Sequence, residues 1–202
     1  RLSSPWAVQL HTPGLIGFHI VARGEAWLLR AGTDPLKLHS GDIVMLPDGI
    51  EHRVQDDPAT RITPQDLMPM LDGPLASPIS LGGSGPGTTL ISGLFRFDIS
   101  LARPLIGALP NILHLRSVAG TPAPWLRIGL QFIAEENAKP LPGQQVIINR
   151  VADILLVEAL RDYVATLPEG HGNWLLALRD NALSAALSAM HREPGRNWTV
   201  PD

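Results

Sequence analysis

Residues 41–56 read GDIVMLPDGIEHRVQD, a pattern of a turn, a strand, a second turn and the start of another strand. The apolar run IVML is typical of a short strand that is buried on both faces. Gly41 before the run, and Pro47 and Gly49 after it, are turn residues, because glycine accepts a positive φ and proline fixes its own. His52 follows the second turn by three residues. The pattern therefore predicts two strands with one imidazole at the corner between them.

The composition is that of a folded domain. Of the 202 residues, 45% are hydrophobic and 17% are charged, so the chain can bury a core and is not disordered by composition. The net charge of -3 argues against a strong nucleic-acid surface on the chain itself. No stretch has the length of a membrane span and no signal peptide is visible, so we expect no membrane partner and a cytoplasmic location. The absence of cysteine excludes disulfides and thiolate metal sites.

Short strands separated by turns follow one another through the first half of the chain. The candidates are Trp6–Leu10, Gly17–Val21, Ala26–Arg30, Leu36–His39 and Thr89–Asp98. This spacing predicts an all-β barrel or sandwich, and the interior of a small barrel can hold one small ligand. The proline- and glycine-rich residues 56–87 predict a flexible insertion, with a helical turn near residues 65–71.

A ligand pocket inside this barrel would be lined by one face of each strand. Alternation places His19 and Val21 on one face of their strand, and Ile91, Phe95 and Phe97 on a barrel-lining face of theirs. The predicted pocket residues are His19, His52, Trp27, Phe95 and Phe97. The aromatic residues, together with Met45, could instead fill the interior and leave a scaffold without a pocket. The sequence leaves both readings open.

The second half of the chain is helical. Helices are predicted over residues 124–139 and 144–165, and a stripe at Leu183, Ala186, Leu187 and Met190 predicts a third over residues 181–191. The helix over residues 144–165 is apolar on more than the single stripe that packing on one core needs. One face would pack within the chain and the other on a second subunit, or the helix could be enclosed within one chain. The predicted dimerisation residues are Ile147, Val151, Ile154 and Leu155.

The spacing in residues 41–56 resembles the second conserved motif of the cupin superfamily, G-x5-P-x-G-x2-H-x3-N. Gly41, Pro47, Gly49 and His52 are in register, and Asp56 stands where the family has asparagine. The resemblance implies a jelly-roll-like β-barrel, followed here by an α-helical region. The first cupin motif, H-x-H followed by glutamate, supplies most of the metal ligands. Residues 17–25 occupy its place with a single histidine.

The metal shell that the cupin resemblance implies is incomplete. An iron or manganese site of this type uses three imidazole nitrogens and a carboxylate, of which His19 and His52 remain. A zinc-like set would need His11, Glu51 or His114 to converge on that pair, and no two histidines show a local ligand spacing. We therefore expect no cofactor. A metal-dependent dioxygenase or isomerase is the alternative function.

Most of the chain also resembles AraC-type transcriptional regulators whose N-terminal half is a cupin-like sensor. The resembling segments are residues 18–27, 41–52, 93–97, 104–110, 113–116, 174–180, 191–194 and 198–200. The resemblance implies a sensor barrel at 1–120, a helical dimerisation and linker region at 121–180, and the start of a DNA-binding domain at 181–202. It further implies a non-enzymatic protein with a small-molecule effector and a homodimer. DNA would be bound by a helix-turn-helix domain outside this sequence, so we expect the chain to be a piece of a longer protein.

Overall fold

The computed structural model describes residues 1–71, 79–96, 106–118, 121–138, 141–168, 181–193 and 195–199. The chain divides into two compact units, Arg1–Ala159 and Leu160–Asp202. The predicted pocket residue Phe97 lies outside the described residues.

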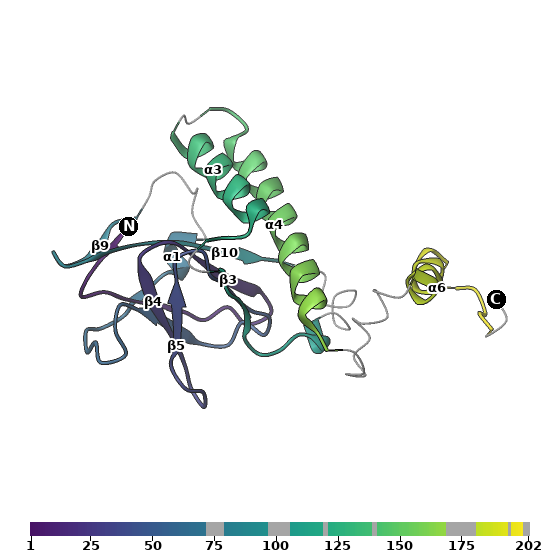
Figure 1. Cartoon of the computed structure of the whole chain (residues 1–202), viewed down its shortest axis with the longest axis horizontal. Coiled ribbons are helices and arrows are strands. Elements are labelled where there is room, and N and C mark those ends of the chain that lie inside the picture. The colour runs from purple at the N-terminus through teal and green to yellow at the C-terminus, as the bar shows by residue number, and fades with distance from the viewer. Residues whose placement is uncertain are drawn as a thin grey trace. The chain divides into compact units, whose positions relative to one another are not determined.

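The first unit contains all of the described strands. They are β1 (Leu2–Ser3), β2 (Ala7–Leu10), β3 (Ile16–Arg23), β4 (Glu25–Arg30), β5 (Leu36–His39), β6 (Ile43–Leu46), β7 (His52–Gln55), β8 (Gln65–Asp66), β9 (Leu81–Gly82), β10 (Gly87–Phe95) and β11 (Leu113–Leu115). The helices are α1 (Met68–Leu71), α3 (Pro124–Ala138), α4 (Gln144–Thr166), which continues into the second unit, and α6 (Asn181–Arg192). The predicted helical turn near residues 65–71 and the three longer helices are confirmed (Figure 1).

The strands form two sheets, which confirms the prediction of a β fold followed by helices. One sheet has six strands in the order β11-β6-β3-β10-β1-β9, and the other has five in the order β5-β4-β7-β2-β8. The long strand β3 lies in the middle of the six-stranded sheet, between β6 and β10. Its residue His19 pairs with Val44 on one side and with Ser92 on the other. This register decides which side chains share the face of His19.

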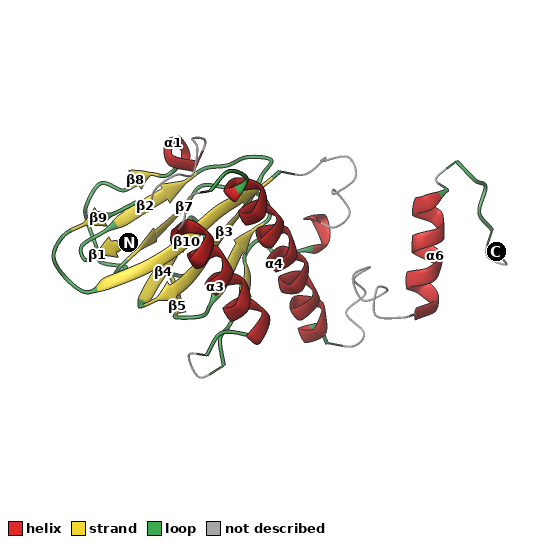
Figure 2. Cartoon of the chain, turned by 90° about the horizontal axis from the view of Figure 1, so that it is seen from above, coloured by secondary structure: helices red, strands yellow, loops and turns green. Residues whose placement is uncertain are grey.

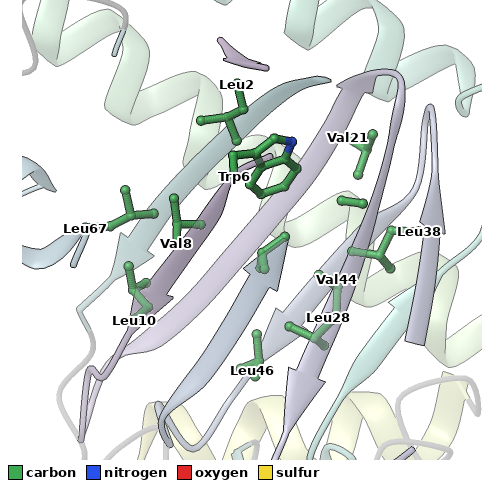
Figure 3. Close-up of a cluster of buried hydrophobic side chains, with 12 residues drawn as sticks. Leu2, Trp6, Val8, Leu10, Val21, Leu28, Leu38, Val44, Leu46 and Leu67 are labelled. Atoms are coloured by element: carbon green, nitrogen blue, oxygen red, sulfur yellow. The ribbon is translucent and has the colours of Figure 1, made fainter. Parts of the chain in front are cut away.

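The hydrophobic core lies where alternate residues of the two sheets meet (Figure 3). Val21 of β3 and Val44 of β6 come from the six-stranded sheet, and Leu28 of β4 and Val54 of β7 from the five-stranded sheet. Side chains that point the same way alternate along a strand, so the residues between them face the opposite side. The whole cluster consists of Leu2, Trp6, Val8, Leu10, Val21, Ala26, Leu28, Leu38, Val44, Leu46, Val54 and Leu67.

The other face of the six-stranded sheet is also buried. Ile20, Ile43 and Met45 alternate with the core residues, yet they are only 2%, 5% and 1% exposed. Helices α3 and α4 lie side by side against this sheet (Figures 1 and 2). A Cβ on Gly129 of α3 would stand 2.5 Å from Leu155 Cδ2 of α4, so the two helices pack closely at this point.

Among the described residues, no helix is both long and apolar enough to cross a membrane. In the second unit, Leu183 and Met190 of α6 are 52% and 42% exposed.

Candidate functional site

The turn after β6 is held against the preceding part of the chain by Gly49. Its φ is +63°, and a Cβ here would stand 1.9 Å from the carbonyl oxygen of Thr12. The amide of Thr12 donates a hydrogen bond to the carbonyl of Gly49 at 2.9 Å. Only glycine allows this close approach at a positive φ. The motif glycine therefore fixes Thr12 beside the turn that leads to His52.

The same turn is fixed from the other side by Arg30. Its side chain is 7% exposed and forms an ion pair with Asp48, with Nη2 and Oδ2 at 2.5 Å. It also donates to the carbonyl of Asn111 at 2.8 Å, while Asp48 accepts a bond from the amide of Ile50 at 3.2 Å. These bonds hold the turn just before β7, which begins at His52.

The two candidate histidines meet in the interior. His19 and His52 are 1% and 2% exposed, and their Nε2 atoms are 2.7 Å apart. The Nδ1 atom of His19 is 2.7 Å from the hydroxyl of Ser92, and the Nδ1 atom of His52 is 3.0 Å from the carbonyl of Ile50. Sequence reasoning placed the two histidines in one pocket but missed Ser92, which the pairing of β3 with β10 brings opposite His19.

These contacts assign the protons on the two rings. A carbonyl only accepts, so His52 Nδ1 carries the hydrogen and, in the neutral ring, Nε2 accepts. His19 must then donate from Nε2, which leaves its Nδ1 to accept from the hydroxyl of Ser92. The result is a chain in which each group donates to the next, from Ser92 through His19 and His52 to Ile50.

The environment favours the neutral form of both rings. Burial, and then the neighbouring His52, hold the pKa of His19 well below its usual value. Burial also lowers the pKa of His52; the bond to the carbonyl of Ile50 raises it, Arg30 lowers it and Asp48 raises it, and the net direction is downward. Two neutral imidazoles with one proton between them agree with the 2.7 Å separation.

A buried hydroxyl beside this pair lacks a protein partner. Among the described residues, the buried side-chain polar atoms without a hydrogen bond are Thr12 Oγ1 and Trp6 Nε1. Thr12 is 1% exposed. A Cβ placed on Gly17 would have Thr12 Oγ1 at 3.7 Å and His52 Cε1 at 3.8 Å. A buried donor without a partner, such as the Thr12 hydroxyl, costs about 1–3 kcal/mol. A hydrogen-bonding group that reached this hydroxyl next to Gly17 would therefore be stabilised there.

The donor set does not fit the metal that a cupin implies. Among the residues that the structure describes, no three histidines, aspartates or glutamates gather in a way that could hold a metal ion. Two imidazole nitrogens on one tetrahedral zinc stand about 3.3 Å apart, given bonds of about 2.0–2.1 Å. The Nε2 atoms here are at hydrogen-bond distance. His11 and Glu51 are exposed and His114 contacts Asp42, so these residues do not complete a zinc-like set with the histidine pair.

The predicted aromatic lining is also wrong where the structure describes it. Phe95 lies on the opposite face of the sheet from His19 and stacks on Phe18, with ring centres 4.9 Å apart. Trp27 lies between Ala26 and Leu28, which both belong to the core, so it faces away from the core and Lys37 Nζ is 5.9 Å from its ring centre. Met45 is buried on the outer face. The buried cluster between the sheets consists of aliphatic residues and Trp6 instead.

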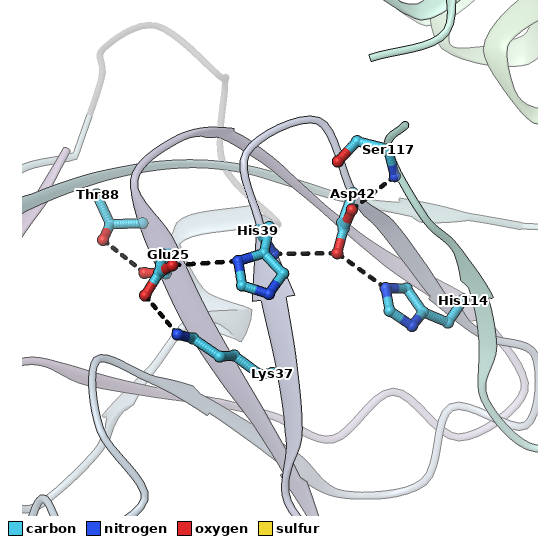
Figure 4. Close-up of polar contacts among 7 residues, drawn as sticks. All are labelled: Glu25, Lys37, His39, Asp42, Thr88, His114 and Ser117. Atoms are coloured by element: carbon cyan, nitrogen blue, oxygen red, sulfur yellow. Dashed lines mark hydrogen bonds and ion pairs between the residues drawn. The ribbon is translucent and has the colours of Figure 1, made fainter. Parts of the chain in front are cut away.

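A second polar cluster, which sequence reasoning missed, lies around Asp42 (Figure 4). Its carboxylate accepts bonds from the amide of His39 at 3.0 Å, the amide of Ser117 at 2.7 Å and His114 Nε2 at 3.0 Å. Burial raises the pKa of Asp42, but these three partners outweigh it and the net direction is downward. The neighbouring Gly41, at φ +88°, lets Pro122 and Ser117 approach, since a Cβ would stand 2.9 Å from each.

The α3–α4 pair carries an exposed apolar face. On α4, Ile147 and Ile154 are 38% and 61% exposed, and on α3 Ile128 and Phe132 are 64% and 48% exposed. Leu155, which was predicted to contribute to dimerisation, is 8% exposed and packs on Gly129. The prediction is wrong for this residue, because its side chain is buried within the chain. Val151 is partly buried. Helix α4 therefore has two apolar faces, of which one is already used within the chain.

Comparison with known proteins agrees with the cupin-like geometry. A family model described as Cupin matches residues 1–165. The HTH-type transcriptional regulator AlkR of Acinetobacter baylyi is 33% identical over 99% of this chain and 66% of its own length. A putative AraC-like transcription regulator of Streptomyces lividans is 32% identical over 98% of this chain and 64% of its own. The HTH-type transcriptional regulator MtrA of Neisseria gonorrhoeae is 29% identical over the same shares. The chain thus spans slightly less than two thirds of these relatives.

Proposed function

The chain belongs to the cupin family and is related to AraC-like transcriptional regulators, and from this premise we propose that it is the effector-sensing and dimerisation region of such a regulator. In this proposal the protein is not an enzyme. A small molecule binds within the β fold, and DNA is bound by a helix-turn-helix region in the part of the relatives that this chain does not span.

The effector site is the interior beside Gly17, His52 and Thr12. The observation that carries this assignment is the unpartnered Thr12 hydroxyl next to a buried, neutral histidine pair. A ligand there meets one hydroxyl and the apolar side chain of Leu10, whose Cδ2 is 3.9 Å from the Cβ position of Gly17. A small apolar molecule with one hydrogen-bonding group matches this lining, because ligand pockets combine apolar walls with few polar groups.

The response is transmitted through β3. The strand carries Gly17 and His19 on the interior side and Phe18 and Ile20 on the side where α3 and α4 pack. A ligand shifts this arrangement only if it binds one position of the strand better than another. A change at Gly17 would be felt on the opposite face through the neighbouring Phe18, which stacks on Phe95.

Dimerisation uses the outer face of α3 and α4. Its apolar residues Ile128, Phe132, Ile147 and Ile154 are all more than a third exposed. A two-fold contact uses each of them twice, and burying an isoleucine contributes about 1.5–3 kcal/mol. The domain assignment follows as a proposal, with the sensor at 1–120, the dimerisation and linker helices at 121–180, and the start of the DNA-binding region at 181–202.

A thermal-shift screen of small apolar alcohols, ketones and phenols tests the proposed site. A molecule that raises the melting temperature should bind Thr12→Val at least about fivefold more weakly, because the variant keeps the shape and removes the hydroxyl. Thr88→Val is the matched control, since the hydroxyl of Thr88 is buried but already bonded to the carbonyl of Glu25 at 2.8 Å. Equal affinity for the parent and Thr12→Val would reject the site.

A further inference from the structure

A shallow pocket lies where the edge strand β5 of one sheet faces the edge strand β11 of the other. Its volume is about 470 Å³, and it is lined from β5 by Leu36, Lys37 and His39 and from β11 and the following segment by His114 and Arg116. Asp42 and Ser117 also line it, and Figure 4 shows the contacts of these two residues with His39 and His114. This pocket is separate from the His19–His52 pair and contains none of its residues.

The Asp42 carboxylate, which lines the pocket, is already hydrogen-bonded within the protein. Asp42 is 2% exposed, and it accepts hydrogen bonds from two backbone amides and from His114. Each of its oxygens has at least one donor at 3.0 Å or less. Asp42 therefore holds the pocket together, and both of its oxygens already have donors within the protein.

The pocket also contains two cationic side chains, Lys37 and Arg116. Lys37 pairs with Glu25 at 2.8 Å, and Glu25 also accepts a bond from His39 Nδ1 at 3.1 Å. An ammonium group has three donors, so Lys37 keeps capacity for another acceptor. Arg116 has no hydrogen bond or ion pair with any residue that the structure describes, and it brings five donors. Leu36 adds an apolar wall.

We propose that this pocket binds a small organic carboxylate, whose oxygens are held by Arg116 and Lys37 and whose apolar part lies against Leu36. Guanidinium groups bind carboxylates through two parallel hydrogen bonds, and Arg116 has the donors for such a pair. The volume is in the range of small-molecule sites. This site is a second input to the chain, in addition to the apolar site beside Thr12.

The pocket is connected to α3 by a short segment. The amide of Ser117 is bonded to Asp42 at 2.7 Å, and Pro122 packs against Gly41 just before α3 begins at Pro124. A ligand that holds Arg116 would therefore restrain the segment that enters α3. Hydrogen exchange should slow in residues 113–118 and in the first turn of α3 when the ligand binds.

The experiment is a calorimetric titration of the full chain with benzoate, succinate and inorganic phosphate. We expect saturable binding of at least one carboxylate, with benzoate ahead of succinate because of Leu36. Arg116→Gln should weaken it by at least about tenfold, the loss of one charge-assisted pair, and Lys37→Gln should weaken it less. Arg53→Gln is the control, since Arg53 is an exposed arginine on β7 outside the pocket.

Three results would overturn the proposal. They are no saturable binding of either carboxylate, binding of phosphate alone, and equal affinities for the parent and Arg116→Gln. The melting temperature of each variant without ligand shows that it is folded; Arg116 is exposed, so its replacement should leave that temperature unchanged. Thr12→Val should leave benzoate binding here intact, so failure at one site is distinguishable from failure at the other.

Discussion

The Nε2 atoms of His19 and His52 are 2.7 Å apart in the interior of the β fold, although the residues are 33 positions apart in the chain. The distance allows one hydrogen between two nitrogens, and the bond from His52 to the carbonyl of Ile50 decides which nitrogen donates it. The pair is therefore an oriented hydrogen-bonded unit.

At neutral pH, His52 should carry its proton on Nδ1 and His19 on Nε2. The carbonyl of Ile50 accepts from the first ring, and the hydroxyl of Ser92 can donate to the second. Long-range 15N–1H NMR spectra of histidine-labelled protein distinguish the two tautomers by their nitrogen shifts. The same tautomer on both rings would contradict the assignment, because one nitrogen of the pair would then lack its partner.

Stability should fall as the pH drops below about 6.5. Both folded-state pKa values are lowered, chiefly by burial, so the unfolded chain binds protons that the folded chain does not. The free energy of unfolding then falls by up to about 1.4 kcal/mol per pH unit for each ring, until the pH reaches the folded pKa values. Urea unfolding at several pH values measures this slope.

The pH slope should decrease in His52→Gln and stay as in the parent in His11→Gln, because His11 is exposed. An unchanged slope in His52→Gln would show that the buried pair is not its source. A separate loss is expected in more acidic solution. Burial raises the pKa of Asp42, but its hydrogen bonds lower it further, so the stability it contributes is lost as the pH falls from 3.8 through the folded pKa.

Two glycine-to-alanine replacements should act in opposite directions. In Gly17→Ala, the new methyl meets its neighbours at 3.7 Å or more on a strand, so stability should rise by about 0.5–1 kcal/mol. In Gly49→Ala, the methyl would stand 1.9 Å from the carbonyl oxygen of Thr12 at a positive φ, and a loss of at least about 3 kcal/mol is expected. Denaturant unfolding of both variants measures the difference.

Gly17→Ala should also weaken any ligand found beside Thr12, since the methyl occupies space between that hydroxyl and His52. A large loss of stability in Gly17→Ala, or a mild effect of Gly49→Ala, would contradict the packing described around the Thr12 turn.

The chain should form a dimer through α3 and α4, and Ile154→Arg should raise the dimer dissociation constant by at least about tenfold. Ile154 of α4 is 61% exposed, and a two-fold contact through this helix would bring two copies of the new charge into the interface. Sedimentation velocity over a range of concentrations measures the equilibrium.

The matched control is Ile62→Arg, in which an exposed isoleucine outside the helices is replaced. Equal dissociation of both variants would point to a general effect of the added charge. A parent chain that is monomeric at high concentration would exclude dimerisation through this helix face.

Local signals in the sequence predicted the elements well. Gly41, Pro47 and Gly49 mark turns because of their backbone chemistry, and that chemistry acts within a few residues. The spacing of apolar residues likewise predicted α3 and α4. The fold class could therefore be predicted from short segments and a motif that places His52.

Which face of each strand points toward the core could not be predicted in the same way. Alternation indicates that Phe95 and Ile91 share a face, but the pairing of Ser92 with His19 decides which face is inside. Helix α4 raised the same difficulty, because the contact of Leu155 with Gly129 determines which of its two apolar faces packs within the chain.

The cluster around Asp42 could not be predicted as a whole, because its members come from two segments that are far apart in the chain, residues 39–42 and 114–117. Asp42 follows the motif glycine directly in the sequence, whereas His114 and Ser117 reach it only through the pairing of β11 with β6. A buried acid within a turn motif was the single feature that could have pointed to partners elsewhere in the chain.

The most direct test of the sensing site is an NMR titration of 15N-histidine-labelled protein with a molecule found in the thermal-shift screen. If that molecule binds beside Gly17, the ring nitrogens of His52 and His19 should shift in a saturable way while those of His11 and His39 stay in place. Saturable shifts confined to surface histidines, or binding without any change at His52, would contradict an effector site inside the β fold.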